Sequence, residues 1–147
     1  MSMRVLLDTS FLLPVVGVRV REVVDGALYR LWQLHKSGEV ELFYTDFNII
    51  EIVWKLSKLE CDPLIVEKGL RSIERSMSKA QPRLGSILKA LELRKKGFRD
   101  VIDLLLYLTA KDNGLLFLTY DVELVRFLKD VGEDVSNIAE NLERLGP

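Results

Sequence analysis

The sequence predicts an α/β protein with three layers, in which helices cover both faces of a central, mostly parallel β-sheet. Two short runs of consecutive apolar residues, 5–7 and 115–118, are typical of strands that are buried on both faces. These runs alternate with longer segments that have helical periodicity, as in repeated strand-helix-strand units. The predicted element order is β-α-β-α-α-α-α-β-α-β.

The first half of the chain contains two predicted strands and three predicted helices. Met3–Leu7 is the first strand, and a loop leads from it to a helix over residues 19–37. Residues 41–45 form the second strand. Asp46 is the expected cap of a helix through residue 59, because its carboxylate can accept hydrogen bonds from free amides of the first turn. A helix over residues 63–78 follows, since proline at position 63 suits a first helical turn.

The second half continues with three helices and two strands. Leu84–Lys95 and residues 100–111 are predicted helices, and Asn113-Gly114 ends the second of them. Residues 115–118 form a strand, Val122–Asp130 form a short helix, and residues 134–138 form an edge strand. No linker or internal repeat divides the chain, so we expect a single domain over residues 1–147.

Composition indicates a globular protein. The chain has 147 residues, 48% of them apolar and 29% charged, with a net charge of −1, unlike the disordered and membrane classes. Folding of a chain of this size buries about 68 to 70% of the surface that the unfolded chain exposes. The isoelectric point near 5.9 argues against a protein that coats nucleic acid by bulk charge. A local basic patch or a metal can still contact phosphates.

Cysteine content and hydropathy point to the cytoplasm. Cys61 is the single cysteine, which excludes an internal disulfide and favours a reducing compartment. The first residues enter a predicted strand directly, without the pattern of a secretion signal. Apolar runs are shorter than the roughly 20 residues that span a bilayer, so no membrane association is expected.

Four acidic residues interrupt or end apolar stretches, where folding alone does not favour them. Asp8 and Asp121 follow two predicted strands, and strand ends carry the chemistry of α/β folds. Glu51 and Asp103 lie within apolar segments, and an unpaired buried carboxylate is costly. Lysine and arginine are scarce nearby, so the pattern suggests a hard divalent cation such as Mg²⁺. Asp100 is a candidate fifth acid, because it shares a helix face with Asp103.

Four segments in this order resemble a known family. They are V-L-L-D-T-S at residues 5–10, N-I-I-E-I at 48–52, D-L-L-L-Y-L-T-A at 103–110 and L-F-L-T-Y-D at 116–121. The set resembles the PIN-domain nucleases, metal-dependent ribonucleases that include the toxin half of many prokaryotic toxin-antitoxin pairs. No single segment is specific, whereas the ordered set spans most of the chain.

The resemblance implies a PIN-like fold and a site that hydrolyses RNA phosphodiester bonds with Mg²⁺ or Mn²⁺. The implied metal-binding and catalytic acids are Asp8, Glu51, Asp103 and Asp121. Thr119 or Ser10 would give polar support to these acids. Asp100 competes with Asp103 for the place of the third acid, and we prefer Asp103 because of its family-like distance from Asp121. The implied partners are an RNA substrate, a possible antitoxin protein and a second copy of the chain in a homodimer.

Other side chains allow two interpretations. The basic residues 94–96 and Arg99 precede the third acidic segment and can contact an RNA backbone or form a solvated helix end. Trp32 and Trp54 are interpreted as packing helices rather than stacking on bases, and some of this apolar surface can instead form a dimer interface.

The sequence leaves competing functions open. A non-catalytic PIN-fold RNA-binding or assembly subunit, or an RNA-processing endonuclease without an antitoxin, fits the same fold. A phosphoryl-transfer enzyme of the haloacid-dehalogenase type needs a second aspartate two residues after Asp8, where the chain has Ser10. A receiver domain needs an acidic pair where the chain has Leu6-Leu7. No glycine-rich phosphate loop is present in the sequence.

Overall fold

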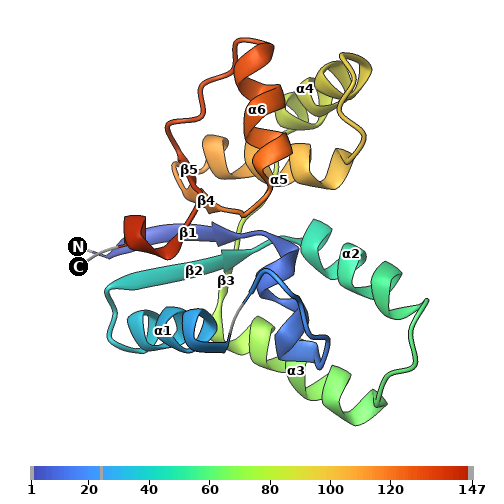
Figure 1. The fold of residues 1–147 in the computed structure, drawn as a ribbon, viewed down its shortest axis with the longest axis vertical. Helices are drawn as coiled ribbons and strands as arrows, with labels where there is room; N and C mark the ends of the chain where they lie inside the picture. The colour runs from blue at the N-terminus through green and yellow to red at the C-terminus, as the bar shows by residue number, and fades with distance from the viewer. Residues whose placement is uncertain (1, 24, 146–147) are drawn as a thin grey trace.

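A five-stranded parallel sheet is the centre of the computed structural model, which describes residues 2–23 and 25–145 (Figure 1). Its strands are β1 (Met3–Leu7), β2 (Val40–Tyr44), β3 (Ser78–Lys79), β4 (Leu116–Leu118) and β5 (Ile138–Ala139). Their spatial order is β3-β2-β1-β4-β5, and every neighbouring pair is parallel. Chain connections run in opposite directions on the two sides of β1, which creates a crevice at the carboxyl ends of β1 and β4, where α/β folds bind ligands.

Helices cover the two faces of this sheet. One face carries α1 (Asp25–Lys36), α2 (Asp46–Leu56) and α3 (Pro63–Ser76), and the other carries α4 (Leu84–Lys95), α5 (Val101–Asp112) and α6 (Val122–Asp130) (Figure 1). This arrangement confirms the predicted three-layer α/β/α fold. None of the described helices is long and apolar enough to cross a membrane.

The central strand β1 contributes to two separate hydrophobic cores. Val5 and Leu7 belong to the core beneath α1, α2 and α3, whereas Leu6 belongs to the core beneath α4, α5 and α6. Successive side chains of a strand point to opposite faces, so a strand with apolar residues at every position fills both cores. Residues 5–7 are all apolar because each of them is buried in one of the two cores.

The segment after β1 differs from the prediction. Residues 9–11 and 13–16 form two short 3₁₀ helices, and α1 begins at Asp25 rather than near residue 19. Gly17 ends the second 3₁₀ helix with φ 93°, a conformation that favours glycine. Gly69 of α3 packs against this segment, and a side chain there would overlap the backbone of Val15. The second 3₁₀ helix thus packs closely on α3 because residue 69 has no side chain, and sequence periodicity does not reveal this contact.

Two short edge strands also differ from the prediction. β3 begins at Ser78, the last residue of the predicted helix, because α3 ends at Ser76 and Met77 is already extended. Its two residues pair with Phe43 and Tyr44 of β2 and are both polar, so they carry no hydrophobic strand signal. β5 begins at Ile138, later than predicted, and pairs with β4.

Helix α2 begins with a capping box rather than with an Asp46 cap. The Thr45 hydroxyl accepts from the Asn48 amide at 3.2 Å, and Asn48 Oδ1 accepts from the Thr45 amide at 2.7 Å. The Asn48 Nδ2 group donates to the Leu7 carbonyl at 3.1 Å and to Thr9 Oγ1 at 3.0 Å. Asp46 pairs instead with Lys79, at 3.0 Å. Asn48 therefore fixes α2 to the carboxyl end of β1, on both sides of residue 8.

We predict that Asn48→Ala lowers the free energy of unfolding by about 2 to 3 kcal/mol. The substitution removes the helix cap and leaves buried polar groups of residues 7, 9 and 45 without their partner. Urea unfolding followed by circular dichroism measures the change. Asp62→Ala is the matched control, because Asp62 caps the exposed start of α3 and its loss costs about 1 kcal/mol. An Asn48→Ala effect no larger than the Asp62→Ala effect would contradict the bridging role.

Candidate metal centre

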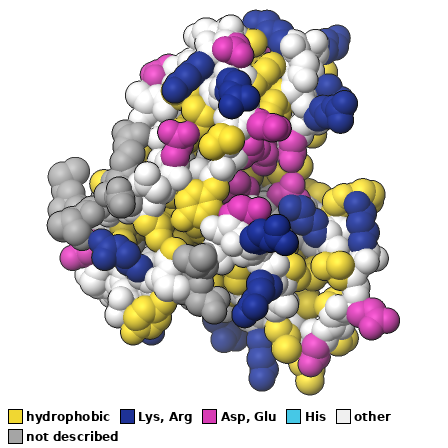
Figure 2. Space-filling model, in the orientation of Figure 1, with side chains coloured by type: hydrophobic (Ala, Val, Ile, Leu, Met, Phe, Trp, Pro, Cys, Tyr) yellow, Lys and Arg dark blue, Asp and Glu magenta, His cyan; other side chains and the backbone are white. Residues whose placement is uncertain are grey.

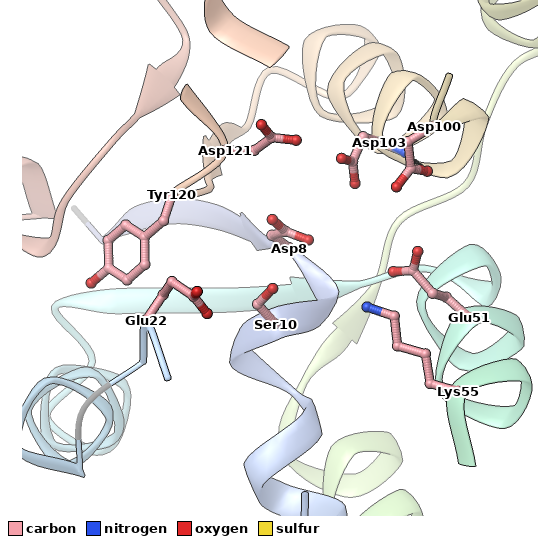
Figure 3. A pocket seen from close by; sticks show the side chains of 9 residues that line it. All are labelled: Asp8, Ser10, Glu22, Glu51, Lys55, Asp100, Asp103, Tyr120 and Asp121. Carbon is pink, nitrogen blue, oxygen red and sulfur yellow. Dashed lines mark hydrogen bonds between the residues drawn. The ribbon is translucent and has the colours of Figure 1, made fainter. Parts of the chain in front are cut away.

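An acidic cleft of about 290 Å³ opens at the carboxyl ends of β1 and β4, beside α2 and α5 (Figure 3). In the space-filling view, acidic side chains gather around a hollow between the two helical layers (Figure 2). The cleft is lined by Asp8, Ser10, Glu22, Glu51, Lys55, Asp100, Asp103, Tyr120 and Asp121. All four predicted acids, together with Ser10 and Asp100, thus lie around one space.

Asp8 is held in place at the end of β1. Its side chain is only 7% exposed, and its Oδ2 atom accepts a hydrogen bond from Thr119 Oγ1 at 2.7 Å. Thr119 is fully buried behind the cleft, and its hydroxyl also accepts from the Asp121 amide at 3.1 Å. The Ser10 backbone amide is a further partner of the Asp8 carboxylate. Thr119 therefore hydrogen-bonds to both residues at the strand ends, to the side chain of Asp8 and to the backbone of Asp121, and its role in the site stays a prediction.

Burial raises the pKa of Asp8 to about 6, because a charged carboxylate is unfavourable away from water. The hydrogen bond from Thr119 lowers this pKa and offsets part of the burial effect. The negative charges of Glu51 and Asp121 raise it further.

Asp103 lies in the first turn of α5 with its side chain turned into the cleft. It is 7% exposed, and burial is the largest cause that raises its pKa to about 10. The charge of Asp8 and a hydrogen bond with Asp121 raise the pKa as well, and the charge of Asp100 adds to them. These carboxyl groups are too close together to be all ionised without a compensating cation.

Asp121 and Asp100 also act as helix caps. Asp121 Oδ1 accepts from the backbone amides of Glu123 and Leu124, both at 3.1 Å, at the start of α6. Asp100 Oδ1 accepts from the amides of Ile102 and Asp103 at the start of α5. A capping role and a place in the cleft are compatible, because each carboxylate has a second oxygen.

Glu51 faces the cleft from the middle of α2, on the side of α5 (Figure 3). One oxygen from each of the carboxylates of Glu51, Asp100 and Asp103 lies within 4.8 Å of the other two. Both Asp100 and Asp103 are therefore close enough to Glu51 to be the third acid, and this distance does not decide between them. Asp103 is buried and interacts with Asp8 and Asp121 as well, whereas Asp100 is exposed at the rim.

The composition of the cleft fits a hard divalent cation. Among the described residues, no lysine or arginine forms an ion pair with any of the six acids that line the cleft. The described residues that line the cleft include no histidine or cysteine, so oxygen is the donor atom that its acids supply. Mg²⁺ and Mn²⁺ prefer such ligands. The role of each acid as a metal ligand stays a prediction.

Three lining residues were not predicted from the sequence. Lys55 lies four residues after Glu51, and this spacing on one helix face is a signal that the sequence does contain (Figure 3). Tyr120 lies between two site residues, and its ring packs against Phe11 at a centroid distance of 4.9 Å. Glu22 comes from the loop before α1, where no periodic pattern indicates its position.

Comparison with known proteins identifies similar folds. The PIN domain family profile matches residues 5–129. The structure of VapBC2 from Rickettsia felis, bound to a DNA fragment from its promoter, contains a similar chain with a TM-score of 0.64 and 15% identity; the match covers 92% of this chain and 96% of that one. Mycobacterium tuberculosis VapC20, described as a sarcin-ricin loop cleaving toxin, matches with a TM-score of 0.62 and 15% identity, covering 89% and 97%. A comparison with curated proteins found no significant match.

We predict that the metal-free protein becomes less stable as pH rises from 5 to 8. The pKa values of folded Asp8 and Asp103, about 6 and about 10, exceed the ordinary value of 3.8. The folded state therefore binds more protons than the unfolded state between pH 5 and 8, and for this reason the free energy of unfolding falls as pH rises through this range. Urea unfolding in EDTA at several pH values measures the trend.

Added Mg²⁺ or Mn²⁺ should reverse this loss at pH 8, by about 2.7 kcal/mol when the metal is at about 100 times its Kd. Asp103→Asn should flatten the pH dependence of the metal-free protein, because the amide does not titrate. Stability that is constant over pH 5 to 8, or equally pH-dependent in Asp103→Asn, would refute the crowding of carboxylates inferred from the geometry.

Proposed function

This chain belongs to the PIN domain family, and we propose that it is a metal-dependent endoribonuclease that hydrolyses RNA phosphodiester bonds. The observation that carries the proposal is the convergence of Asp8, Glu51, Asp103 and Asp121 on one cleft, from segments far apart in the sequence. Their electrostatic crowding favours a bound cation over ion pairs within the protein. Phosphodiester hydrolysis is the chemistry that such a site supports best.

We assign the four carboxylates to holding the cation. Mg²⁺ or Mn²⁺ bound there would supply an activated water, polarise the phosphate and neutralise charge on the leaving oxygen. Thr119 orients the Asp8 carboxylate through its 2.7 Å hydrogen bond. Asp103 would have to be ionised to hold a cation, so cation binding would oppose its raised pKa.

A toxin role is supported by the fold comparisons. One similar chain comes from a VapBC2 structure and another is described as a sarcin-ricin loop cleaving toxin. We infer that this chain is the toxin component of a toxin-antitoxin pair and that an antitoxin protein is its partner. The single cysteine is consistent with a reducing cytoplasm. An RNA-processing endonuclease without an antitoxin is the alternative, and a small gene directly upstream would favour the toxin.

A homodimer is supported by an apolar stripe on α4. Leu84, Ile87, Leu88 and Leu91 are all exposed, and their spacing places them on one face of the helix. This face points away from the buried face of the same helix, which packs on α5. Exposed stripes of this kind are typical of protein interfaces.

The stripe is complementary to itself when two α4 helices lie antiparallel about a twofold axis. With the axis between residues 87 and 88, Leu84 of one copy faces Leu91 of the other. The same register places Ile87 and Leu88 of the two copies against each other at the centre of the contact. We therefore propose α4 as the self-association surface, because an isologous interface requires such a match.

We predict that the purified protein cleaves single-stranded RNA with Mg²⁺ or Mn²⁺ and stops cleaving in EDTA. Asp8→Asn should reduce the cleavage rate by more than about 100-fold, since even partners of metal ligands contribute 10- to 100-fold. Labelled RNAs of varied sequence, separated on denaturing gels, measure cleavage. Glu123→Gln is a matched control, because Glu123 is an exposed acid of the first turn of α6 outside the cleft.

Equal cleavage by the wild-type protein and Asp8→Asn would indicate a contaminating nuclease and refute the assignment. If neither protein cleaves any RNA while both isothermal titration and unfolding show metal binding, a non-catalytic RNA-binding or assembly subunit becomes the correct account.

We predict that Leu88→Glu converts the dimer to a monomer in multi-angle light scattering. The substituted side chain places a charge in the centre of the α4 stripe, where two copies meet. Tyr29→Glu is the control, because Tyr29 is a comparably exposed residue on α1. A wild-type monomer at high concentration, or a Leu88→Glu dimer, would rule out this interface.

A further inference from the structure

Trp54 does not pack helices, contrary to the interpretation of the sequence. Trp32, the other tryptophan, is partly buried and packs against the core beneath α1, α2 and α3. Trp54 is 61% exposed on α2, and the neighbouring Ile50 and Val53 are exposed as well. A large aromatic side chain left in solvent beside a candidate active site suggests that it binds a ligand.

Trp54 lines a groove of about 570 Å³ between α2 and the start of α5. The lining residues are Ile50, Glu51, Trp54, Lys55, Arg99, Asp100, Val101 and Ile102. Three of them, Glu51, Lys55 and Asp100, also line the acidic cleft. The groove therefore continues from the cleft, and a chain whose phosphate lies at the acids can extend past Trp54.

The charges of the groove match a polyanion. Lys55 and Arg99 line it, and Lys58 Nζ lies over the Trp54 ring, 4.1 Å from the ring centroid. The two acids of the groove, Glu51 and Asp100, lie where it joins the cleft. An aromatic ring with cations beside it offers a stacking surface for a base and partners for a phosphate.

We propose that this groove binds the nucleotide next to the scissile phosphate of single-stranded RNA. In this proposal, which rests on the nuclease function proposed above, the base stacks on Trp54 and its phosphate contacts Lys55 and Arg99. Single-stranded RNA is the substrate that fits, because the bases of a duplex are stacked and paired and their faces are not free.

Binding of a nuclease-resistant RNA tests the groove separately from cleavage. The probe is a fluorescein-labelled, 2′-O-methylated single strand of about ten nucleotides in Mg²⁺, read by fluorescence polarisation. Trp54→Ala should weaken binding about tenfold and raise KM for a cleavable strand, whereas Trp54→Phe keeps a flat ring and should bind nearly as the wild type does. Tyr29→Ala, a comparably exposed aromatic residue on α1, should have no effect. Circular dichroism and thermal unfolding verify the fold of each variant.

Arg99→Gln provides a second measurement. Loss of one phosphate contact should lower affinity for every sequence and reduce the slope of log K against log salt by about 0.7 for a single strand. An unchanged slope would remove Arg99 from the RNA path and contradict the proposed position of the phosphate.

Three outcomes distinguish the ways in which the proposal can fail. If the wild type binds and cleaves RNA and Trp54→Ala has the wild-type affinity, the groove is not a nucleotide site although the nuclease function stands. If Trp54→Ala changes the mass measured by light scattering and leaves RNA affinity unchanged, the patch is a protein interface. If the wild type binds metal but neither binds nor cleaves any single strand, the nuclease function fails and the groove assignment fails with it.

Discussion

Parallel pairing of β1 with β2 on one side and with β4 on the other is the constraint on which the rest of the structure depends. Parallel neighbours have their carboxyl ends at the same edge, so Asp8 and Thr119 meet although 111 positions separate them. Asn48 then fixes the start of α2 to this edge through the Leu7 carbonyl. The start of α5 adds Asp103 from the opposite layer, so both helical layers contribute acids to one cleft.

The cleft illustrates a balance between stability and chemistry. Grouping carboxylates away from water opposes folding, and the raised pKa of Asp103 is a measure of that opposition. Local hydrogen bonds offset part of the cost, because Asp121 and Asp100 cap helices with the same carboxylates that line the cleft. The cation site proposed above depends on the unfavourable charge that remains.

Much of the fold was predictable because both layers of helices and the central strands carry strong hydrophobic patterns. Asp8 and Asp121 were identified from the apolar runs that precede them, and Asp103 from the run that it interrupts. Features that depend on tertiary contact were not predictable. The polar β3 exists only because β2 pairs with it, and the cap at Thr45 prevailed over Asp46 because Asn48 has buried partners on another segment.

Asp8 and Thr119 also have a consequence for how the protein is made. During translation Asp8 is synthesised first, and Thr119, which follows β4 and donates to the Asp8 carboxylate, is synthesised 111 positions later. β4 is also the strand that joins β1 to β5, so the acidic cluster cannot assemble on a nascent chain that lacks it. Chains that end before β4 consequently lack the complete acidic cluster.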